Sequence, residues 1–333
     1  MRWAWLAAFC VLACAQPAGP SSLRYATPYP PQHPFSRADK AWIDHVQTAS
    51  GGRLHIEPFW SGSLLSSDQS LIELRHGVAD VGVISPIYAR GGAHALRTQS
   101  GIYAGAATIE AQVAIYKCLA QRFPVLNEEL AGLHVLAVQG GNLPGVITRE
   151  KPVRALHDLT GLRLRAPSEL MEVLQALGVD PVNMPMGDVY SSLAKGVIDG
   201  VVAPPDTLRA LHLAEVGHFY AQLAIPRGAY PARAISSQAL ARLPKELQAI
   251  VLASGTVWEA ALSKELAAAL QGGRRYAVER GMQFTDLPDA EQRAFADAYN
   301  VAAKANARRL AVRGIDGEAM FESAQAFVRQ PCL

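Results

Sequence analysis

Short stretches in which hydrophobic residues alternate with polar ones recur along the chain, separated by longer stretches with hydrophobic residues every three to four positions. The first pattern predicts strands with one buried face, and the second predicts amphipathic helices. Strands are expected near 23–27, 53–59, 81–85, 133–138, 146–148, 162–165, 200–202 and 232–235. Helices are expected near 36–50, with Ser36 as cap, and near 67–76, 111–123, 168–177, 188–195, 205–213, 244–271 and 289–312. This order predicts an α/β protein.

One strand carries two arginines into the start of a helix. Leu162 and Leu164 alternate with Arg163 and Arg165, and Pro167 ends the strand because proline has no N–H for the ladder. One arginine should face solvent or an acidic neighbour, and the other is free to face a cleft. A guanidinium fork matches a carboxylate, and a helix N-terminus adds donors. From spacing alone, two solvated arginines are the more ordinary interpretation.

A short unit occurs twice. The run LRHGVAD at 74–80 matches LAKGVID at 193–199, and each combines a helix end, a glycine, an apolar pair and an aspartate before a buried strand. The repetition predicts two similar α/β lobes. Asp80 and Asp199 are more simply explained as capping their turns than as catalytic or metal-binding groups.

The expected lobes consist of residues 22–142 plus 231–270 and residues 143–230 plus 271–333. The glycine-rich piece 140–145 lacks a phosphate-binding pattern and is interpreted as a flexible crossing between the lobes. Helical spacing continues from Pro244 to about Gln271, with Gly255 as a weak point. A helix of this length is expected to brace both lobes.

Composition narrows the functional classes. The 333 residues are 50% hydrophobic and 18% charged, with a net charge of +2. This charge is too small to argue for nucleic-acid binding. The sequence contains no Gly-x-Ser-x-Gly, no His-Glu-x-x-His and no nucleotide fingerprint. We therefore expect a binding protein without cofactor or metal rather than an enzyme.

The first residues resemble an export signal. Met1-Arg2 is a short positive end, and Trp3 to Ala13 is apolar but too short to span a bilayer. Residues 1–21 are interpreted as signal peptide and disordered start, which predicts a periplasmic protein. Two routes stay open: cleavage near Gln16, or lipid attachment at Cys14. In an oxidising compartment the remaining Cys118 and Cys332 are candidates for a disulfide.

Three linked motifs then resemble a known family. They are DLTGLRLRAP at 158–167, LGVDPVNMP at 177–185 and DVYSSLAKGVIDG at 188–200. In this order they are similar to DctP-type periplasmic solute-binding proteins, which serve tripartite ATP-independent periplasmic (TRAP) transporters. The resemblance implies a two-lobed periplasmic-binding-protein fold with a hinge and a long bracing helix. It also implies that Arg165 grips the carboxylate of an organic acid and that a TRAP permease is the partner.

The sequence departs from the family pattern at two places. Gly145 stands where many members carry a second ligand-facing arginine, and Ala203 stands where many carry asparagine. Met186 replaces a phenylalanine found in some relatives. A pocket with fewer polar groups favours a monocarboxylate with an apolar or aromatic body over a dicarboxylate. The full set of expected ligand contacts is Arg165, Met186, Ser85, Tyr230, Tyr29, Trp60, Ala203 and Asn142.

The function expected is that of a monomeric receptor whose lobes close on the ligand. A sensor subunit or stand-alone receptor is the alternative within the binding class, and a secreted lyase or hydrolase of small acids is the alternative outside it.

Overall fold

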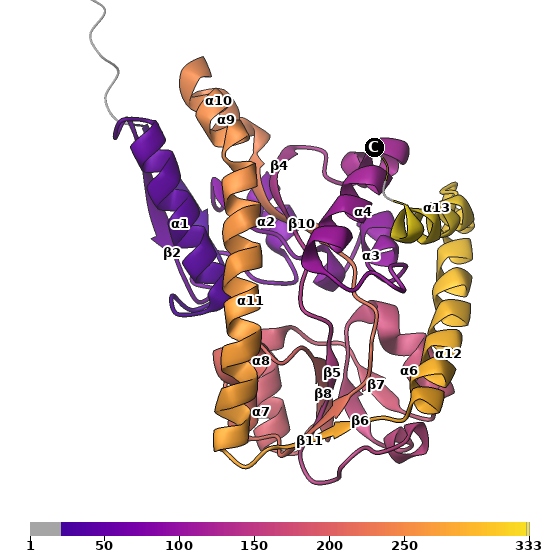
Figure 1. Cartoon of the computed structure of the whole chain (residues 1–333). Coiled ribbons are helices and arrows are strands. Elements are labelled where there is room, and N and C mark those ends of the chain that lie inside the picture. Colours follow the sequence, from indigo (N-terminus) through magenta and orange to yellow (C-terminus); the bar gives the residue numbers. More distant parts are fainter. Residues whose placement is uncertain (1–20, 331, 333) are drawn as a thin grey trace, which may run out of the picture.

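The molecule contains two β-sheets, one in the upper lobe and one in the lower lobe of Figure 1. The computed structural model describes residues 21–330 and residue 332. The predicted signal peptide up to residue 20 and Cys14 lie outside the described residues. The first sheet has the order β2-β1-β3-β10-β4, and the second has the order β11-β9-β5-β8-β6-β7. The predicted two-lobed α/β architecture is confirmed.

The first sheet is mixed. Its strands are β1 (Ser21–Ala26), β2 (Leu54–Phe59), β3 (Val81–Val83), β4 (Leu133–Gln139) and β10 (Tyr230–Ser236). Strand β1 pairs in parallel with β2 and β3, and β10 runs antiparallel between β3 and β4. The second sheet contains β5 (Gly145–Thr148), β6 (Arg163–Arg165), β7 (Asp180–Val182), β8 (Gly200–Ala203), β9 (Phe219–Gln222) and β11 (Gln283–Asp286).

Helices cover both sheets. The α-helices are α1 (Pro34–Ala49), α2 (Ser70–Arg75), α3 (His94–Gln99), α4 (Ile109–Arg122), α5 (Val125–Glu128), α6 (Met171–Ala176), α7 (Val189–Ala194), α8 (Thr207–Ala210), α9 (Ser237–Arg242), α10 (Lys245–Ala253), α11 (Gly255–Glu279), α12 (Asp289–Arg308) and α13 (Gly317–Arg329). Short 3-10 turns include η1 (Pro86–Tyr88), η3 (Ser168–Leu170) and η4 (Met186–Asp188).

The repeated sequence unit has the same structure in both sheets. Asp80 accepts a 2.8 Å hydrogen bond from the backbone N–H of Arg24, and Asp199 accepts a 2.7 Å bond from that of Arg163. Each aspartate therefore fastens its turn to the neighbouring strand. Gly77 and Gly196 take φ values of +76° and +69°, which are easy only for glycine.

The start of α1 differs from the prediction. His33, rather than Ser36, caps the helix, and its Nδ1 accepts from the N–H of Phe35 at 3.2 Å. Pro34 follows at the first helical position, where its missing N–H costs nothing. The rule that favours serine at helix starts therefore failed here, because a histidine next to proline already supplied an acceptor.

The predicted helix 244–271 is two helices. Helix α10 ends at Ala253, and α11 begins at Gly255 and continues to Glu279. A Cβ atom on Gly255 would lie 2.0 Å from the carbonyl oxygen of Leu136, so the glycine lets α11 lie directly on β4. The break falls at the weak point expected from the sequence, and close packing against the sheet explains it.

Helix α11 runs along both sheets, as Figure 1 shows. In the first sheet's layer, Trp258 of α11 stacks on Trp42 of α1 with ring centroids 3.9 Å apart. The Trp258 Nε1–H also donates to Asp39, which pairs with the buried Arg233 at 3.0 Å. Further along α11, Gly273 lies against the backbone of Pro205, which follows β8 of the second sheet.

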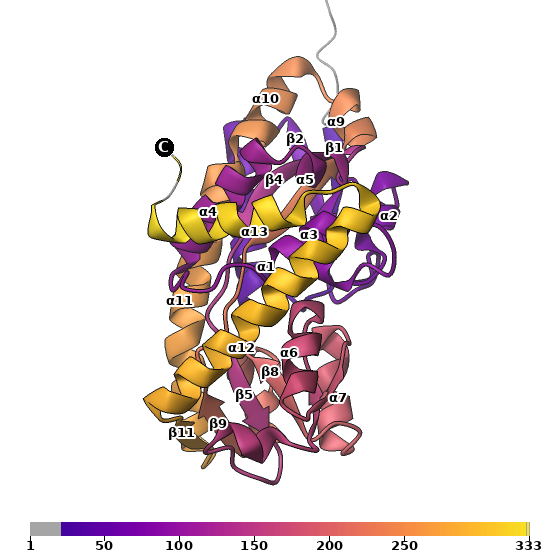
Figure 2. The ribbon, with the colours of Figure 1, turned by 90° about the vertical axis from the view of Figure 1, so that its right-hand side faces the viewer.

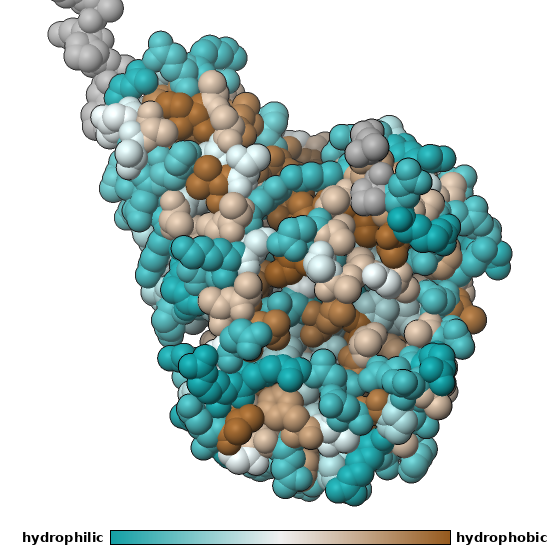
Figure 3. Space-filling view, in the orientation of Figure 1, coloured by the Kyte–Doolittle hydropathy of each residue, from teal (hydrophilic) through white to brown (hydrophobic). Residues whose placement is uncertain are grey.

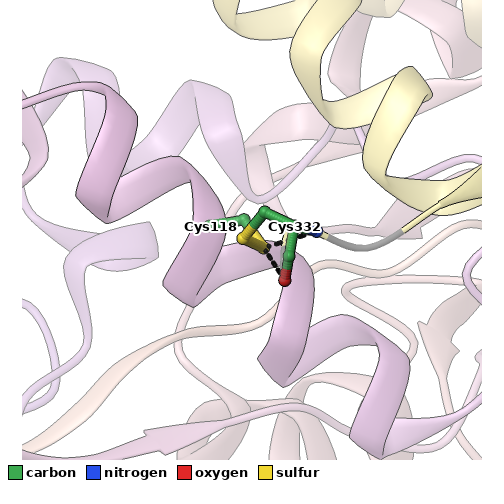
Figure 4. The surroundings of a disulfide bond; sticks show 2 residues. All are labelled: Cys118 and Cys332. Atoms are coloured by element: carbon green, nitrogen blue, oxygen red, sulfur yellow. Dashed lines mark hydrogen bonds between the residues drawn. A yellow bond between two sulfur atoms is a disulfide. The ribbon is translucent and has the colours of Figure 1, made fainter.

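The C-terminal helices form a second connection. Helix α12 packs on α6 and α3 and crosses the molecule obliquely in Figure 2. Helix α13, whose residues we expected in the second lobe, instead packs on α4 beside the first sheet. The Cys118–Cys332 disulfide joins α4 to the chain just beyond α13 and confirms the predicted pairing (Figure 4).

The surface in Figure 3 is mainly hydrophilic over the lower lobe, with hydrophobic areas scattered over the upper one. Within residues 21–330, no helix has the length and hydropathy needed to cross a membrane.

Candidate ligand-binding site

A cavity of about 90 Å³ lies between the two lobes and receives side chains from both. Tyr29, Tyr88 and Tyr230 come from segments that follow or begin strands of the first sheet, whereas Arg165 and Met186 come from the second. A single water molecule needs roughly 10–15 Å³. The cavity therefore has room for a small organic molecule.

Arg165 ends β6 and is the charged group with the most ordered surroundings. Its side chain is buried, with only 3% of the residue exposed. Nε donates to the carbonyl oxygen of Met184 at 2.9 Å, Nη1 to that of Val202 at 3.4 Å, and Nη2 to the Tyr88 hydroxyl at 2.5 Å. Among the described residues no carboxylate lies within 4.0 Å of this guanidinium to neutralise it.

The other arginine of the strand points away. Arg163 is exposed and lies 3.5 Å from a carboxylate oxygen of Asp180 on β7. Two residues apart on a strand, Arg163 and Arg165 project from the same side, so their surroundings differ because of their places along β6, with Arg165 at the end that borders the cavity. Spacing alone left this division open, and the family resemblance pointed to Arg165 as the cavity residue.

Aromatic rings form much of the remaining wall. Burial raises the pKa values of Tyr29 and Tyr230, so both keep their hydroxyl protons across the physiological range. Tyr29 stacks on His33 at 4.4 Å. Apolar side chains complete the wall: Ile87, Leu170, Met186, Val202, Leu211 and Leu266.

Arg227 brings a second guanidinium to the cavity. It lies in the segment between β9 and β10, and its Nη1 donates to the carbonyl oxygen of Asn142 at a long 3.4 Å. Its Cζ lies 2.3 Å from where a Cβ on Gly141 would be, so a side chain at residue 141 would displace this guanidinium. No described carboxylate lies within 4.0 Å of Arg227 either.

Two acidic residues also line the cavity. Burial raises the pKa values of Glu169 and Asp206, and the nearby arginines oppose this rise. Asp206 accepts a 2.8 Å hydrogen bond from the Asn142 amide. Glu169 Oε2 is buried and meets no hydrogen-bond partner among the described residues.

Four of the eight predicted contacts line the cavity: Arg165, Met186, Tyr29 and Tyr230. The other four, Ser85, Trp60, Ala203 and Asn142, do not.

Two of the four lie beside residues that do line it. Ala203 is buried on the opposite side of β8, while Val202 and Pro204 line the cavity. The inference of a lost amide at this position therefore has no support from the cavity. Ser85 is buried and donates its N–H to Ser70 Oγ at 3.0 Å, and Tyr88, three residues later, reaches the ligand space.

The remaining two support other residues. Trp60 packs edge-on against Tyr25 with centroids 5.8 Å apart. Asn142 holds Asp206 with its side chain and Arg227 with its carbonyl group. It therefore positions two lining residues from outside the cavity.

Gly145 explains one departure from the family pattern. A Cβ atom here would lie 2.4 Å from the carbonyl oxygen of Ala221 and 2.7 Å from the Tyr220 ring. Strand β9 comes too close for any side chain on β5 at this residue. Arg227, which sequence reasoning missed, provides the second cationic group from another segment.

The residues missed from the sequence are Tyr88, Glu169, Asp206 and Arg227. Glu169 lies just beyond the first recognised motif, four residues after Arg165, and a helix start at a ligand site was a usable signal. The sequence around Arg227 carries no distinctive signal, because an arginine between a proline and a glycine in a connecting segment is typical of many surface loops.

Comparisons with known proteins identify the family of this chain. The model of bacterial extracellular solute-binding protein family 7 (DctP) matches residues 25–309. The chain belongs to this family. A curated family relative, the monocarboxylate 2-oxoacid-binding periplasmic protein of Nostoc sp., is 27% identical over 179 residues. The match covers 53% of this chain and 48% of that protein, so the chain spans about half the length of the curated relatives it matches.

Solved structures share the fold. A TRAP solute-binding protein from Rhodoferax ferrireducens, in complex with copurified benzoate, has a TM-score of 0.84 and 24% identity, covering 93% of this chain and 98% of that one. A TRAP periplasmic solute-binding protein from Bordetella bronchiseptica, with bound (R)- and (S)-mandelate, has a TM-score of 0.82 and 21% identity, covering 93% and 99%.

Proposed function

We propose that this protein is a periplasmic receptor that binds an organic acid between its lobes and delivers it to a TRAP permease. The observation that carries the proposal is the Arg165 guanidinium, which is buried, held by two carbonyl oxygens and a hydroxyl, and not neutralised by a described carboxylate. A buried cation that no carboxylate contacts directly is costly. A ligand carboxylate would supply the missing charge.

The cavity wall favours a monocarboxylate with an aromatic or apolar body. Tyrosine rings and aliphatic side chains dominate the wall, and such surfaces recognise flat apolar groups. The benzoate and mandelate complexes of structural neighbours are consistent with a ligand of this class. The positive charge of Arg227 would attract the same ligand carboxylate, by direct contact or from nearby. Asp206 and Glu169 would limit the net positive charge of the cavity.

Closure of the lobes would enclose the ligand. The chain passes between the sheets after β4, between β9 and β10, and along α11, and these connections are the candidate hinge. A ligand that contacts both lobes would favour the closed arrangement, and a permease would recognise that form. We expect export by cleavage of the N-terminal signal, or anchoring through Cys14, and a monomeric receptor.

A thermal-shift screen of the purified protein tests the receptor role. A ligand that binds only the folded state stabilises it by about 2.7 kcal/mol at a hundredfold excess over its Kd. The panel should contain benzoate, mandelate, 2-oxo acids, succinate and a uronate. A raised midpoint with monocarboxylates supports the proposal in full. A response to succinate alone rejects the monocarboxylate class, and a flat response to every acid rejects the receptor role.

A further inference from the structure

Glu169 has an unmet hydrogen-bonding requirement inside the cavity. It lies in η3, four residues after Arg165, and lines the cavity wall. A Cβ on Gly101 would come within 2.6 Å of the Glu169 Cβ, so the stem of the side chain is packed against α3 and its following turn. Its Oε2 atom is buried without a partner in the described part of the chain.

The donors of Arg165 and Tyr299 are directed elsewhere. All three nitrogens of the Arg165 guanidinium donate to Met184, Val202 and Tyr88. The Tyr299 hydroxyl, which approaches from α12, donates to the carbonyl oxygen of Gly101 at 2.6 Å. Native proteins rarely leave a buried carboxylate oxygen without a donor. Its position on the cavity wall points to a group on the ligand.

We propose that the ligand carries a hydroxyl group that pairs with the Glu169 carboxyl group, in addition to the carboxylate that binds Arg165. The ligand class is then a hydroxy-substituted carboxylic acid with an aromatic or apolar body. This inference rests on the proposed receptor function and adds a second recognition element to it.

A hydroxyl fits this position better than a charged group. It both donates and accepts, so it pairs with a carboxyl in either protonation state. A second ligand carboxylate would meet the negative charge of ionised Glu169. A ligand ammonium group would meet Arg165 and Arg227, whose positive charges both act on Glu169.

Matched pairs of acids test the inference. Mandelate differs from phenylacetate by one hydroxyl, and 3-hydroxybenzoate and 4-hydroxybenzoate each differ from benzoate by one. Isothermal titration should show that the wild-type protein binds at least one hydroxy acid about 10- to 100-fold more tightly than its partner, the range typical of hydrogen bonds to charged groups.

Two variants of similar shape separate the hydrogen bond from the charge. Glu169→Met removes both, and the preference within the pair should fall below about threefold. Glu169→Gln removes the charge but keeps a carbonyl acceptor, and most of the preference should remain. Both variants alter the electrostatic attraction for every carboxylate, and that effect cancels in the ratio within a pair. Melting of the ligand-free variants checks that they are folded.

Three results would count against the inference in different ways. Equal binding within every pair by the wild type would mean that the ligand makes no hydrogen bond to Glu169. A preference that survives in Glu169→Met would place the hydroxyl against another residue. If benzoate and phenylacetate bind while the hydroxy acids do not, the receptor role stands and the hydroxyl subsite is rejected. Absence of binding by all of these acids, by contrast, overturns the receptor proposal itself.

Discussion

Arg165 combines burial with a full set of partners that cannot neutralise it. Carbonyl oxygens and a tyrosine hydroxyl fix the direction of its guanidinium without removing its charge. This arrangement orients a cation in advance for an anion, so little side-chain entropy is lost when the anion arrives. Arg163, two residues earlier on the same strand, is exposed and beside Asp180, and it serves as an internal control.

Replacing Arg165 with alanine should weaken carboxylate binding by roughly 2–5 kcal/mol, because a buried charge-assisted contact is lost. Arg165→Lys should recover only part of the affinity, since an ammonium group cannot make the parallel two-bond contact. Arg163→Ala should bind like the wild type. Titration calorimetry with the best acid of the screen measures all three, and an unchanged Kd in Arg165→Ala would remove this residue from the site.

His33 predicts a pH dependence of stability. Burial, with help from Arg233 and Arg37, lowers the pKa of His33 to about 3. Below about pH 6.5 the unfolded chain takes up a proton that the folded chain refuses. This residue should therefore reduce stability as the pH falls from 6.5 towards 3, by at most about 1.4 kcal/mol per pH unit.

His33→Asn keeps a side-chain acceptor for the start of α1 but does not titrate. Urea unfolding at pH 7 and pH 4.5 should show a smaller acid-induced loss of stability in this variant than in the wild type. Other groups titrate in both proteins, so the difference between the two losses reports His33. Equal acid-induced losses of stability in the two proteins would show that folding does not lower the pKa of His33.

At the scale of elements, α11 is placed by its glycines. Gly255 admits the backbone of β4 and Gly273 admits the backbone of Pro205, so a single helix lies against both lobes. Glycine is a poor helix former, and it is tolerated in these two turns because the close approach excludes any side chain. Gly272, by contrast, has only the tip of Arg209 nearby, at 3.9 Å.

Alanine substitutions at Gly272 and Gly273 should change the free energy of unfolding in opposite directions. Gly273→Ala would bring a methyl group within 2.1 Å of the Pro205 carbonyl oxygen and should destabilise the protein by roughly 1–3 kcal/mol. Gly272→Ala should stabilise it by roughly 0.5–1 kcal/mol, through better helix propensity. Chemical unfolding of the two variants decides this, and two effects of the same sign would mean that α11 does not approach Pro205 as described.

At the scale of the molecule, two helices span the lobes and the disulfide secures the end of one connection. Helix α12 leaves the second sheet, and α13 returns the chain to α4, where Cys332 joins Cys118. The two cysteines are 214 residues apart in sequence. A crosslink across so long a loop greatly restricts the unfolded chain.

Loss of this disulfide should lower the free energy of unfolding by about 2–4 kcal/mol. Reduced wild type and Cys332→Ala should unfold at nearly the same denaturant concentration, below that of the oxidised protein. Reaction of the denatured, non-reduced protein with a thiol reagent provides the chemical check. Free Cys118 and Cys332 in the exported protein would contradict the pairing.

Much of the fold was accessible from the sequence because it depends on local patterns. Alternation in 162–165 predicted the strand, the linked motifs singled out Arg165 on it, and the repeated glycine–aspartate unit predicted two similar lobes. Boundaries at helix starts and in short helices were less accessible, as His33 and α8 show. There, one neighbouring acceptor or one tertiary contact outweighs a weak propensity.

The sequence by itself determined the two-lobed α/β class and the family, and its linked motifs singled out Arg165, because hydrophobic periodicity and such motifs are properties of consecutive residues. Only the tertiary structure decided which other side chains join Arg165. Two of them, Tyr88 and Arg227, come from segments far from Arg165 in the chain. The third, Glu169, lies in a nearby turn whose direction depends on packing. Ala203 does not line the cavity, because a one-residue difference in a strand reverses the face and that register is set by neighbouring strands.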